Sequence, residues 1–262
     1  MFSDMVYTPA VLLVFSLLPA SGLTAQHNSS IVNGAEVRPN FKPYMVSVQT
    51  ENKKHICGGF LVSDNFVMTA AHCFTWGEKL TVVVGAHDIT RLKMSAHRID
   101  VTHYHIHPGY NAKTFESDIM LLQLVKPAPK SKAVQPIPLP KKDTDIKVKS
   151  SCNVAGWGAT KTDGTANPRL LEVNVSVVDR GSCQRSWGKT VTITQSMICA
   201  GGTASDYKGV CQGDSGGPLV CKGTAVGVVS FNERENCKEP QAPNVYTKIS
   251  KYLCWIKCII KY

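Results

Sequence analysis

One serine of the chain lies among unusually small neighbours. Ser215 stands in the segment GDSGGP (213–218), between Asp214 and two glycines. A serine hydroxyl is a weak nucleophile, and it attacks a carbonyl group only when a base accepts its proton and N–H donors stabilise the oxyanion. Glycines let the backbone bend so that such N–H groups converge on one point. We therefore predict that Ser215 is a nucleophile and that the amides of Gly213 and Ser215 form an oxyanion hole.

A nucleophilic serine needs a histidine base, and the base needs a carboxylate that orients it. His72, in MTAAHC, follows an apolar segment and adjoins Cys73, which could fix its position. Asp118, in SDIMLLQL, precedes the most apolar of the predicted strands, where a carboxylate would be shielded from water. We predict that His72 and Asp118 act with Ser215. Three alternating histidines could instead bind a metal, but a hydrated strand edge explains them better; they are His103, His105 and His107.

The elements that must position these residues are short strands. From residue 31 onward, short segments rich in β-branched and aromatic residues are separated by Gly, Pro, Asn and Asp, a pattern typical of all-β sandwiches and barrels. The Pro- and Lys-rich residues 125–145 lack strand character and are typical of a linker between two β halves. Only the tail, from about residue 250 to 262, has apolar residues at helical spacing.

Export is indicated by the N-terminus and by the cysteines. Residues 10–20 form an apolar run too short to span a bilayer, and small residues follow it, so we predict a signal peptide over 1–25. No other segment is long and apolar enough to span a membrane. An even number of cysteines, ten, after a signal peptide predicts a disulfide framework. No paired C-x-x-C motif indicates zinc, and we expect neither a metal nor a cofactor.

The net charge is +10, and Asp4 is the only charged residue among the first 30, so their removal raises it to +11. Such a charge favours polyanions, including sulfated glycans, nucleic acid and anionic surfaces. Seven lysines lie between Lys126 and Lys149, and a solvated loop accounts for them as well as an anion site does. No aromatic residues are interleaved with them, so nothing indicates specific nucleic-acid binding.

Several motifs together resemble the trypsin/chymotrypsin family of serine proteases. They are IVNG, CGGFLVSDNFVMTAAHC, SDIMLLQL, VAGWG and GDSGGPLVC, in that order from Ile31 almost to the C-terminus. The order of His72, Asp118 and Ser215 along the chain is that of the chymotrypsin triad. The resemblance implies a serine endopeptidase that acts on proteins or peptides. It also implies two six-stranded antiparallel β-barrels with the active site in the cleft between them, over about 31–140 and 141–249, and then a short C-terminal helix over about 250–262.

The same resemblance implies four disulfides: Cys57–Cys73, Cys152–Cys221, Cys183–Cys199 and Cys211–Cys237. Cys254 and Cys258 fall outside this pattern, four residues apart on one face of the predicted helix. They could pair with each other, pair with a partner chain or stay free.

The resemblance also implies synthesis as a zymogen. Cleavage before Ile31 would release an α-ammonium group that pairs with Asp214, a carboxylate that is costly to bury alone. Residues 26–30 are then an activation peptide. That peptide ends in Ser30, so the activating peptidase is not of the tryptic kind.

Substrate preference is expected to depend on Gly209. Trypsin-like members carry an aspartate six residues before the nucleophile, where this chain has Gly209, so cleavage after Lys or Arg is not expected. Other predicted pocket residues are Val210, Ser230, Phe231, Asn232 and Asn244. This neutral pocket favours an aromatic or large aliphatic side chain, as in chymases. If Asn232 blocks the mouth, small or polar side chains are favoured instead.

The short propeptide, the basic surface and the tail resemble the granzyme and mast-cell-protease branch. That branch implies secretion, storage in granules and binding to sulfated proteoglycans.

Asn174 stands in a glycosylation sequon, on the opposite strand face from Val173 and Val175. Two rival functions are a catalytically weak polyanion-binding protein on the same fold and a digestive protease.

Overall fold

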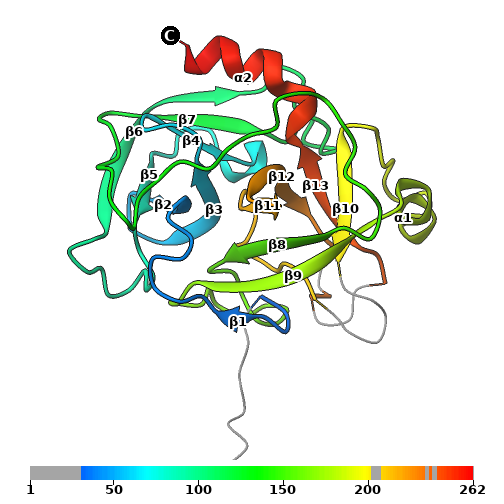
Figure 1. Cartoon of the computed structure of the whole chain (residues 1–262), viewed down its shortest axis with the longest axis horizontal. Coiled ribbons are helices and arrows are strands. Elements are labelled where there is room, and N and C mark those ends of the chain that lie inside the picture. The colour runs from blue at the N-terminus through cyan, green and yellow to red at the C-terminus, as the bar shows by residue number, and fades with distance from the viewer. Residues whose placement is uncertain (1–30, 202–207, 234–235, 238–240, 262) are drawn as a thin grey trace, which may run out of the picture.

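Two β-barrels lie side by side in the computed structural model, and a helix at the C-terminal end packs across the top of the view (Figure 1). The structure describes residues 31–201, 208–233, 236–237 and 241–261. The predicted signal peptide over 1–25 and activation peptide over 26–30 lie outside these ranges. None of the described helices is long and apolar enough to cross a membrane.

The first barrel closes from six antiparallel strands. Its interior is filled by aliphatic and aromatic side chains such as Val46, Phe60 and Leu122, each fully buried. Around the barrel the strands run β2 (Met45–Thr50), β3 (His55–Leu61), β4 (Phe66–Thr69), β7 (Met120–Leu124), β6 (His97–Ile106) and β5 (Leu80–Val84).

The second barrel also closes from six antiparallel strands, because β8 pairs with β9 at the ends of the sheet. The short β1 (Ala35–Glu36) adds to β9 from outside. Around the barrel the strands run β9 (Leu171–Val178), β10 (Met197–Gly201), β13 (Asn244–Lys248), β12 (Thr224–Phe231), β11 (Pro218–Cys221) and β8 (Ser151–Gly156). The prediction of an all-β fold with two six-stranded antiparallel barrels is confirmed.

Helices are few and short: η1 (Ala71–Cys73), α1 (Arg180–Trp187), η2 (Ile249–Tyr252) and α2 (Leu253–Ile260). The predicted C-terminal helix is present, and its Ile256 packs into the core of the first barrel although the helix follows the last strand of the second. Helix α1 was not predicted from the sequence. That helix buries only Cys183, so it lacks an apolar stripe, and it begins where Asp179 caps the amide of Ser182.

Candidate active site

His72 and Asp118 come together from two elements of the first barrel. His72 lies in η1, directly after β4, and the Cys57–Cys73 disulfide ties the neighbouring residue to β3. Asp118 lies just before β7, where its side chain is completely buried. The distance from His72 Nδ1 to Asp118 Oδ2 is 2.7 Å, and the His72 amide donates to Oδ1 at 3.0 Å. Because a carboxylate only accepts, Nδ1 carries the proton and Nε2 is left available as a base.

Asp118 is also held by the second barrel. Ser230 Oγ donates to Asp118 Oδ2 at 2.5 Å, and Thr247 Oγ1 donates to the backbone oxygen of Asp118 at 2.9 Å. Both partners are buried, so the carboxylate is satisfied although it is removed from water. The sequence analysis placed Ser230 only in a pocket wall and did not identify Thr247, because neither residue type indicates a partner more than 100 positions away.

Ser215 faces the same cleft as His72. This cleft has a volume of about 1040 Å³ and takes lining residues from both barrels. Gly58 in β3 donates its amide to the carbonyl oxygen of Ser215 at 2.8 Å, which ties the serine backbone to the first barrel. Gly216, one residue on, has a φ of 81°, and a Cβ there would collide with Thr69 Oγ1. The glycine directly after Ser215 is therefore required by both conformation and space.

The amides of Gly213 and Ser215 are oriented by the carbonyl groups of the same peptide units. Gln212 O accepts from Ala159 N at 2.7 Å, and Asp214 O accepts from Gly217 N at 3.0 Å. In a trans peptide the N–H points away from the C=O, so the Gly213 and Ser215 amides face the opposite side. Within the described ranges neither amide donates to another protein group. Both donors are thus free for a ligand oxygen, and Gly213 adopts a φ of 94° that favours glycine.

His55 supports Gly213 from behind, a role that the sequence analysis did not find. His55 Nε2 donates to the carbonyl oxygen of Gly213 at 2.9 Å, while Nδ1 accepts from Ser47 Oγ at 2.8 Å. Burial lowers the pKa of His55 to about 4, so this imidazole is neutral at physiological pH. Only its place in β3 beside the CGG segment could have drawn attention to it.

Ile31 and Asp214 are both completely buried in the second barrel. Val32 pairs with Gly209 in an isolated β-bridge, which places the start of the described chain beside the predicted pocket. Asp214 accepts from the amides of Gly158 at 2.8 Å and Cys211 at 3.0 Å, and no described cation pairs with it. Burial raises the pKa of Asp214 to about 7, and these two bonds only partly oppose the shift. In the intact chain the nitrogen of Ile31 belongs to a peptide bond and carries no charge.

Asn244 fills the position that a side chain at residue 209 would take. A Cβ on Gly209 would collide with Asn244 Oδ1, which accepts from the Val210 amide at 3.2 Å. Because that amide can only donate, the orientation of the Asn244 side chain is fixed, with Nδ2 on the other side. Asn244 is 4% exposed and places a neutral amide against Gly209, and neither of these two predicted pocket residues lines the cleft itself, whereas Val210 and Ser230 do.

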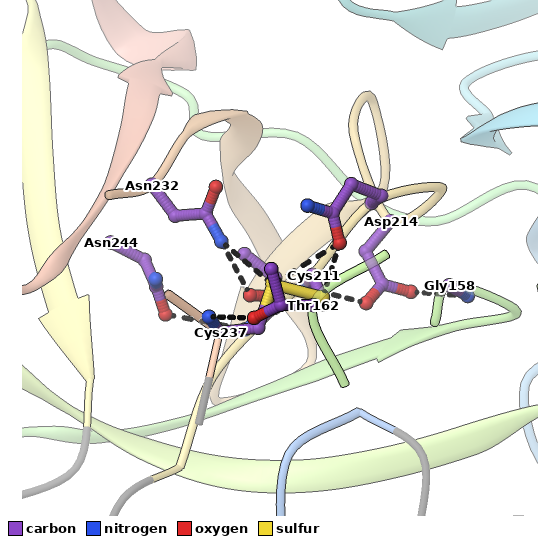
Figure 2. The surroundings of a disulfide bond; sticks show 9 residues. Gly158, Thr162, Cys211, Asp214, Asn232, Cys237 and Asn244 are labelled. Atoms are coloured by element: carbon purple, nitrogen blue, oxygen red, sulfur yellow. Dashed lines mark hydrogen bonds between the residues drawn. A yellow bond between two sulfur atoms is a disulfide. The ribbon is translucent and has the colours of Figure 1, made fainter. Parts of the chain in front are cut away.

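Asn232 crosses the predicted pocket from the opposite wall. Figure 2 shows its amide directed toward the Cys211–Cys237 disulfide, and Nδ2 donates to the carbonyl oxygen of Val210 at 2.9 Å. This bond joins residue 232 to the wall that contains Val210. Phe231, beside it, packs against Phe115 and Trp187 and lines the same cleft as Asn232.

The four predicted disulfide pairings are all present in the structure: Cys57–Cys73, Cys152–Cys221, Cys183–Cys199 and Cys211–Cys237. Cys254 and Cys258 are exposed free thiols on α2. Asn174 is exposed on β9 between the buried Val173 and Val175, and its Oδ1 accepts from Asn153 at 3.0 Å.

Two of the three alternating histidines lie on β6, where His105 is 3.2 Å from Gln123 Oε1, and His107 packs against Tyr252 and Trp255. The described residues contain one group with metal-like spacing, Cys57, His72 and Cys73. Its two cysteines are bonded to each other, so their sulfur atoms are not thiolate ligands.

Known proteins with similar sequences are proteases. The chain is 40% identical to mast cell protease 3 of Ovis aries, over 94% of this chain and 95% of that protein. It is 39% identical to duodenase-1 of Bos taurus, covering 94% of both, and 39% identical to granzyme B of Homo sapiens, covering 96% and 97%. The solved structure of neuropsin, a serine protease expressed in the limbic system of mouse brain, superposes with a TM-score of 0.80. It is 34% identical, and the match covers 88% of this chain and all of neuropsin.

The sequence profile of the trypsin family matches residues 31–256, which include both barrels and the cleft between them. The two-barrel fold, the identity to named proteases and this match agree along nearly the whole chain. The chain therefore belongs to the trypsin family of serine proteases.

Proposed function

We propose that the chain is an endopeptidase in which Ser215, His72 and Asp118 form the catalytic triad. His72 Nε2 accepts the proton of Ser215 Oγ as the serine attacks the scissile carbonyl carbon, and an acyl-enzyme forms when His72 protonates the leaving amine. Water then attacks the acyl-enzyme: His72 accepts a proton from this water and returns it to Ser215 Oγ as the new carboxylic acid leaves. Asp118 holds the tautomer of His72 that leaves Nε2 free and stabilises the imidazolium, through the 2.7 Å contact with Nδ1.

The free amides of Gly213 and Ser215 supply the oxyanion hole. Negative charge develops on the carbonyl oxygen during attack, and donors that are already oriented stabilise it without reorganisation. Removal of one such donor typically costs about 10²-fold to 10³-fold in kcat. Support from His55 behind Gly213 and from Ala159 on Gln212 keeps these donors in place.

The observation that carries this proposal is the buried Asp118 bonded to His72 in a cleft that also contains Ser215. It is tested by labelling with a fluorophosphonate, which reacts with an activated serine. In protein that begins at Ile31, Ser215 Oγ should attack the phosphorus atom and give its proton to His72, so that one fluoride ion leaves the reagent per protein molecule and the phosphonyl group stays on Ser215. Ser215→Ala should abolish labelling and peptide cleavage, while Ser186→Ala, an exposed serine of the same cleft, should retain both. Labelling that survives Ser215→Ala would contradict the assignment.

Activation is proposed to follow cleavage before Ile31 by a separate peptidase. A new α-ammonium group at the buried Ile31 would compensate the carboxylate of Asp214, which has no described cation in the intact chain. The intact chain should therefore show little activity, and protein that begins at Ile31 should show full activity. A protein with one extra residue before Ile31 tests this, because it retains the cleft and loses the correctly placed ammonium.

For specificity we propose small or polar side chains before the cleaved bond. Gly209 and the neutral Asn244 offer no carboxylate to Lys or Arg, which supports the expectation of non-tryptic cleavage. Of the two alternatives for a neutral pocket we favour the narrower one, because Asn232 lines the cleft and its bond to Val210, another lining residue, holds its side chain there. Sequencing the products of a diverse peptide mixture distinguishes small, aromatic and basic residues at this position.

We also propose that the protein is secreted, stored in granules and bound there to sulfated proteoglycans. The exposed lysines of residues 126–149, the charge of +10 and the similarity to mast cell protease 3 support this. An exposed Asn174 is compatible with glycosylation. Elution from heparin resin at a higher salt concentration than a neutral protease, and loss of mass on deglycosylation, are the corresponding measurements.

A further inference from the structure

A cavity of about 640 Å³ opens at the end of the second barrel, and it shares no lining residue with the active-site cleft. Strand ends of this barrel form one side, with Ser151 of β8, Cys221 of β11 and Lys248 of β13 among them. Residues 140–147 of the segment between the barrels form the other side. The volume falls within the range of small-molecule sites, roughly 300–1,000 Å³, and barrel mouths are among their usual places.

The inner surface of this barrel-end cavity is apolar. Ile198 and Val226 belong to the barrel core and are each 6% exposed, so the cavity reaches down to the core itself. Ile146 packs against that core from the connecting segment, and Pro140 and the Cys152–Cys221 disulfide complete this surface. A ligand that excludes water from these groups gains free energy in proportion to the apolar area covered.

The rim of the barrel-end cavity is positively charged. Lys248 is buried and pairs with Asp143 and Asp145, which neutralises it. The remaining four lining lysines form no ion pair with any described residue; they are Lys141, Lys142, Lys147 and Lys222. Asp145 is the one acidic residue that lines the cavity, and it is already engaged by Lys248 and Arg180. The local field therefore favours a negative charge at the mouth.

We propose that the barrel-end cavity binds a small amphiphilic anion, an apolar chain or ring that carries one carboxylate or sulfate group. The apolar body lies against Ile146, Ile198 and Val226, and the anionic group lies among the unpaired lysines. A sulfated glycan matches only the lysines, because it has no apolar body to occupy the cavity. This site is independent of the triad and does not rest on the proposed function.

Dodecanoate is a suitable probe, titrated calorimetrically below its micelle concentration into the full chain. One saturable site per molecule is expected, with a negative heat-capacity change from the buried apolar surface. Dodecanol lacks the charge and inorganic sulfate lacks the apolar body, and each should bind at least about tenfold more weakly. Equal binding of dodecanol and dodecanoate would contradict the role of the lysines.

Two sets of variants locate the site. Lys147→Gln with Lys222→Gln removes two exposed charges and should weaken dodecanoate binding about fivefold to tenfold. Thr224→Trp, at a partly exposed lining position, fills the cavity and should abolish binding. Lys53→Gln with Lys54→Gln removes the same charge from exposed positions of the first barrel and should change nothing.

Near-UV circular dichroism confirms that each variant is folded. The proposal is overturned if dodecanoate does not bind, or if binding survives both Thr224→Trp and the lysine pair. It is also overturned if a sulfated disaccharide binds as tightly as dodecanoate and still binds Thr224→Trp, because the lysines would then serve a polyanion outside the cavity.

Discussion

Asn232 Nδ2 lies 2.9 Å from the carbonyl oxygen of Val210, and this single hydrogen bond links the two walls of the predicted specificity pocket. Asn244 Oδ1 accepts from the amide of the same Val210 at 3.2 Å. The backbone of Val210 is thus held by two asparagine side chains, its carbonyl group by Asn232 and its amide by Asn244.

Replacement of Asn232 by glycine should widen the pocket. Asn232→Gly removes the bond to Val210 and the side chain that obstructs a ring, so kcat/KM for substrates with Phe or Tyr before the cut should rise about tenfold or more relative to Ala. The measurement is a set of peptides that differ only at that residue. Asn52→Gly, in an exposed turn, is the control, and an unchanged Phe-to-Ala ratio in Asn232→Gly would exclude Asn232 as the obstruction.

Loss of the Ser230 hydroxyl should weaken the support of Asp118. Ser230→Ala removes a buried hydrogen bond to a carboxylate, an interaction worth about 1.5–3 kcal/mol, and should lower both stability and kcat. Denaturant unfolding and steady-state kinetics measure the two effects. Ser151→Ala, at an exposed position of β8, should change neither, and equal stability of Ser230→Ala and the parent would be evidence against the bond.

Asp214 should make the intact chain less stable as pH rises. Its pKa is about 7 in the folded protein against an ordinary value of 3.8, so between pH 4 and 7 the folded state retains a proton that the unfolded state loses. Proton release therefore favours unfolding, and this contribution to the unfolding free energy falls through that window by an amount on the order of 4 kcal/mol.

The comparison that isolates this effect is Asp214→Asn, which should have a flatter stability profile between pH 4 and 7 than the parent. Asp163→Asn, at an exposed position, should follow the parent. Protein that begins at Ile31 should also lose the dependence, because its α-ammonium group would keep Asp214 ionised. A parallel decline in Asp214→Asn and the parent would show that other groups cause it.

His55 should have the opposite effect on the pH dependence of stability: it should make the folded protein less stable as pH falls. The pKa of His55 is about 4 in the folded protein and ordinarily 6.5. Between pH 6.5 and 4 the unfolded state therefore binds a proton at this residue that the folded state does not bind. The unfolding free energy should fall as pH drops from 6.5 to 4, by an amount on the order of 3 kcal/mol. His55→Gln should remove this component and His97→Gln should not, as measured by denaturant unfolding at several pH values.

Cys254 and Cys258 should not form a disulfide with each other. They stand four residues apart on a continuous helix, where Cβ atoms are about 5–6 Å apart, whereas a disulfide brings them to about 3.5–4.5 Å. Mass spectrometry of the unreduced, alkylated protein should find no peptide with a 254–258 bond. Four internal disulfides should be found in the same digest, and they serve as the control.

The sequence was sufficient for the barrels and for the residues whose neighbours define them. Apolar strands flank His72 and Asp118, and the glycines around Ser215 indicate the backbone bend that the structure contains. The support of these residues could not be predicted, because it consists of contacts between distant positions. His55 reaches Gly213 across 158 residues, and Ser230 reaches Asp118 across 112.

Prediction from the sequence reaches a similar limit for the pocket. A narrowing by Asn232 could be anticipated from its size, but the direction of its amide could not, because its partner is the carbonyl oxygen of Val210, 22 positions away. The helix α1 also escaped prediction, since its formation relies on a cap at Asp179 and a disulfide at Cys183 and not on an apolar face. Local pattern thus predicts elements well and long-range geometry poorly.

Asp118 belongs to one barrel, yet it is tied to the other through Ser230 and Thr247. The alignment of the Asp118 carboxylate with His72 therefore depends on the position of the two barrels relative to each other. A slippage of the barrels too small to melt either one would already detach these hydroxyl groups and leave a buried charge poorly held. On warming, catalytic activity should therefore be lost before the β-structure unfolds. Heat inactivation would begin at the interface between the two barrels.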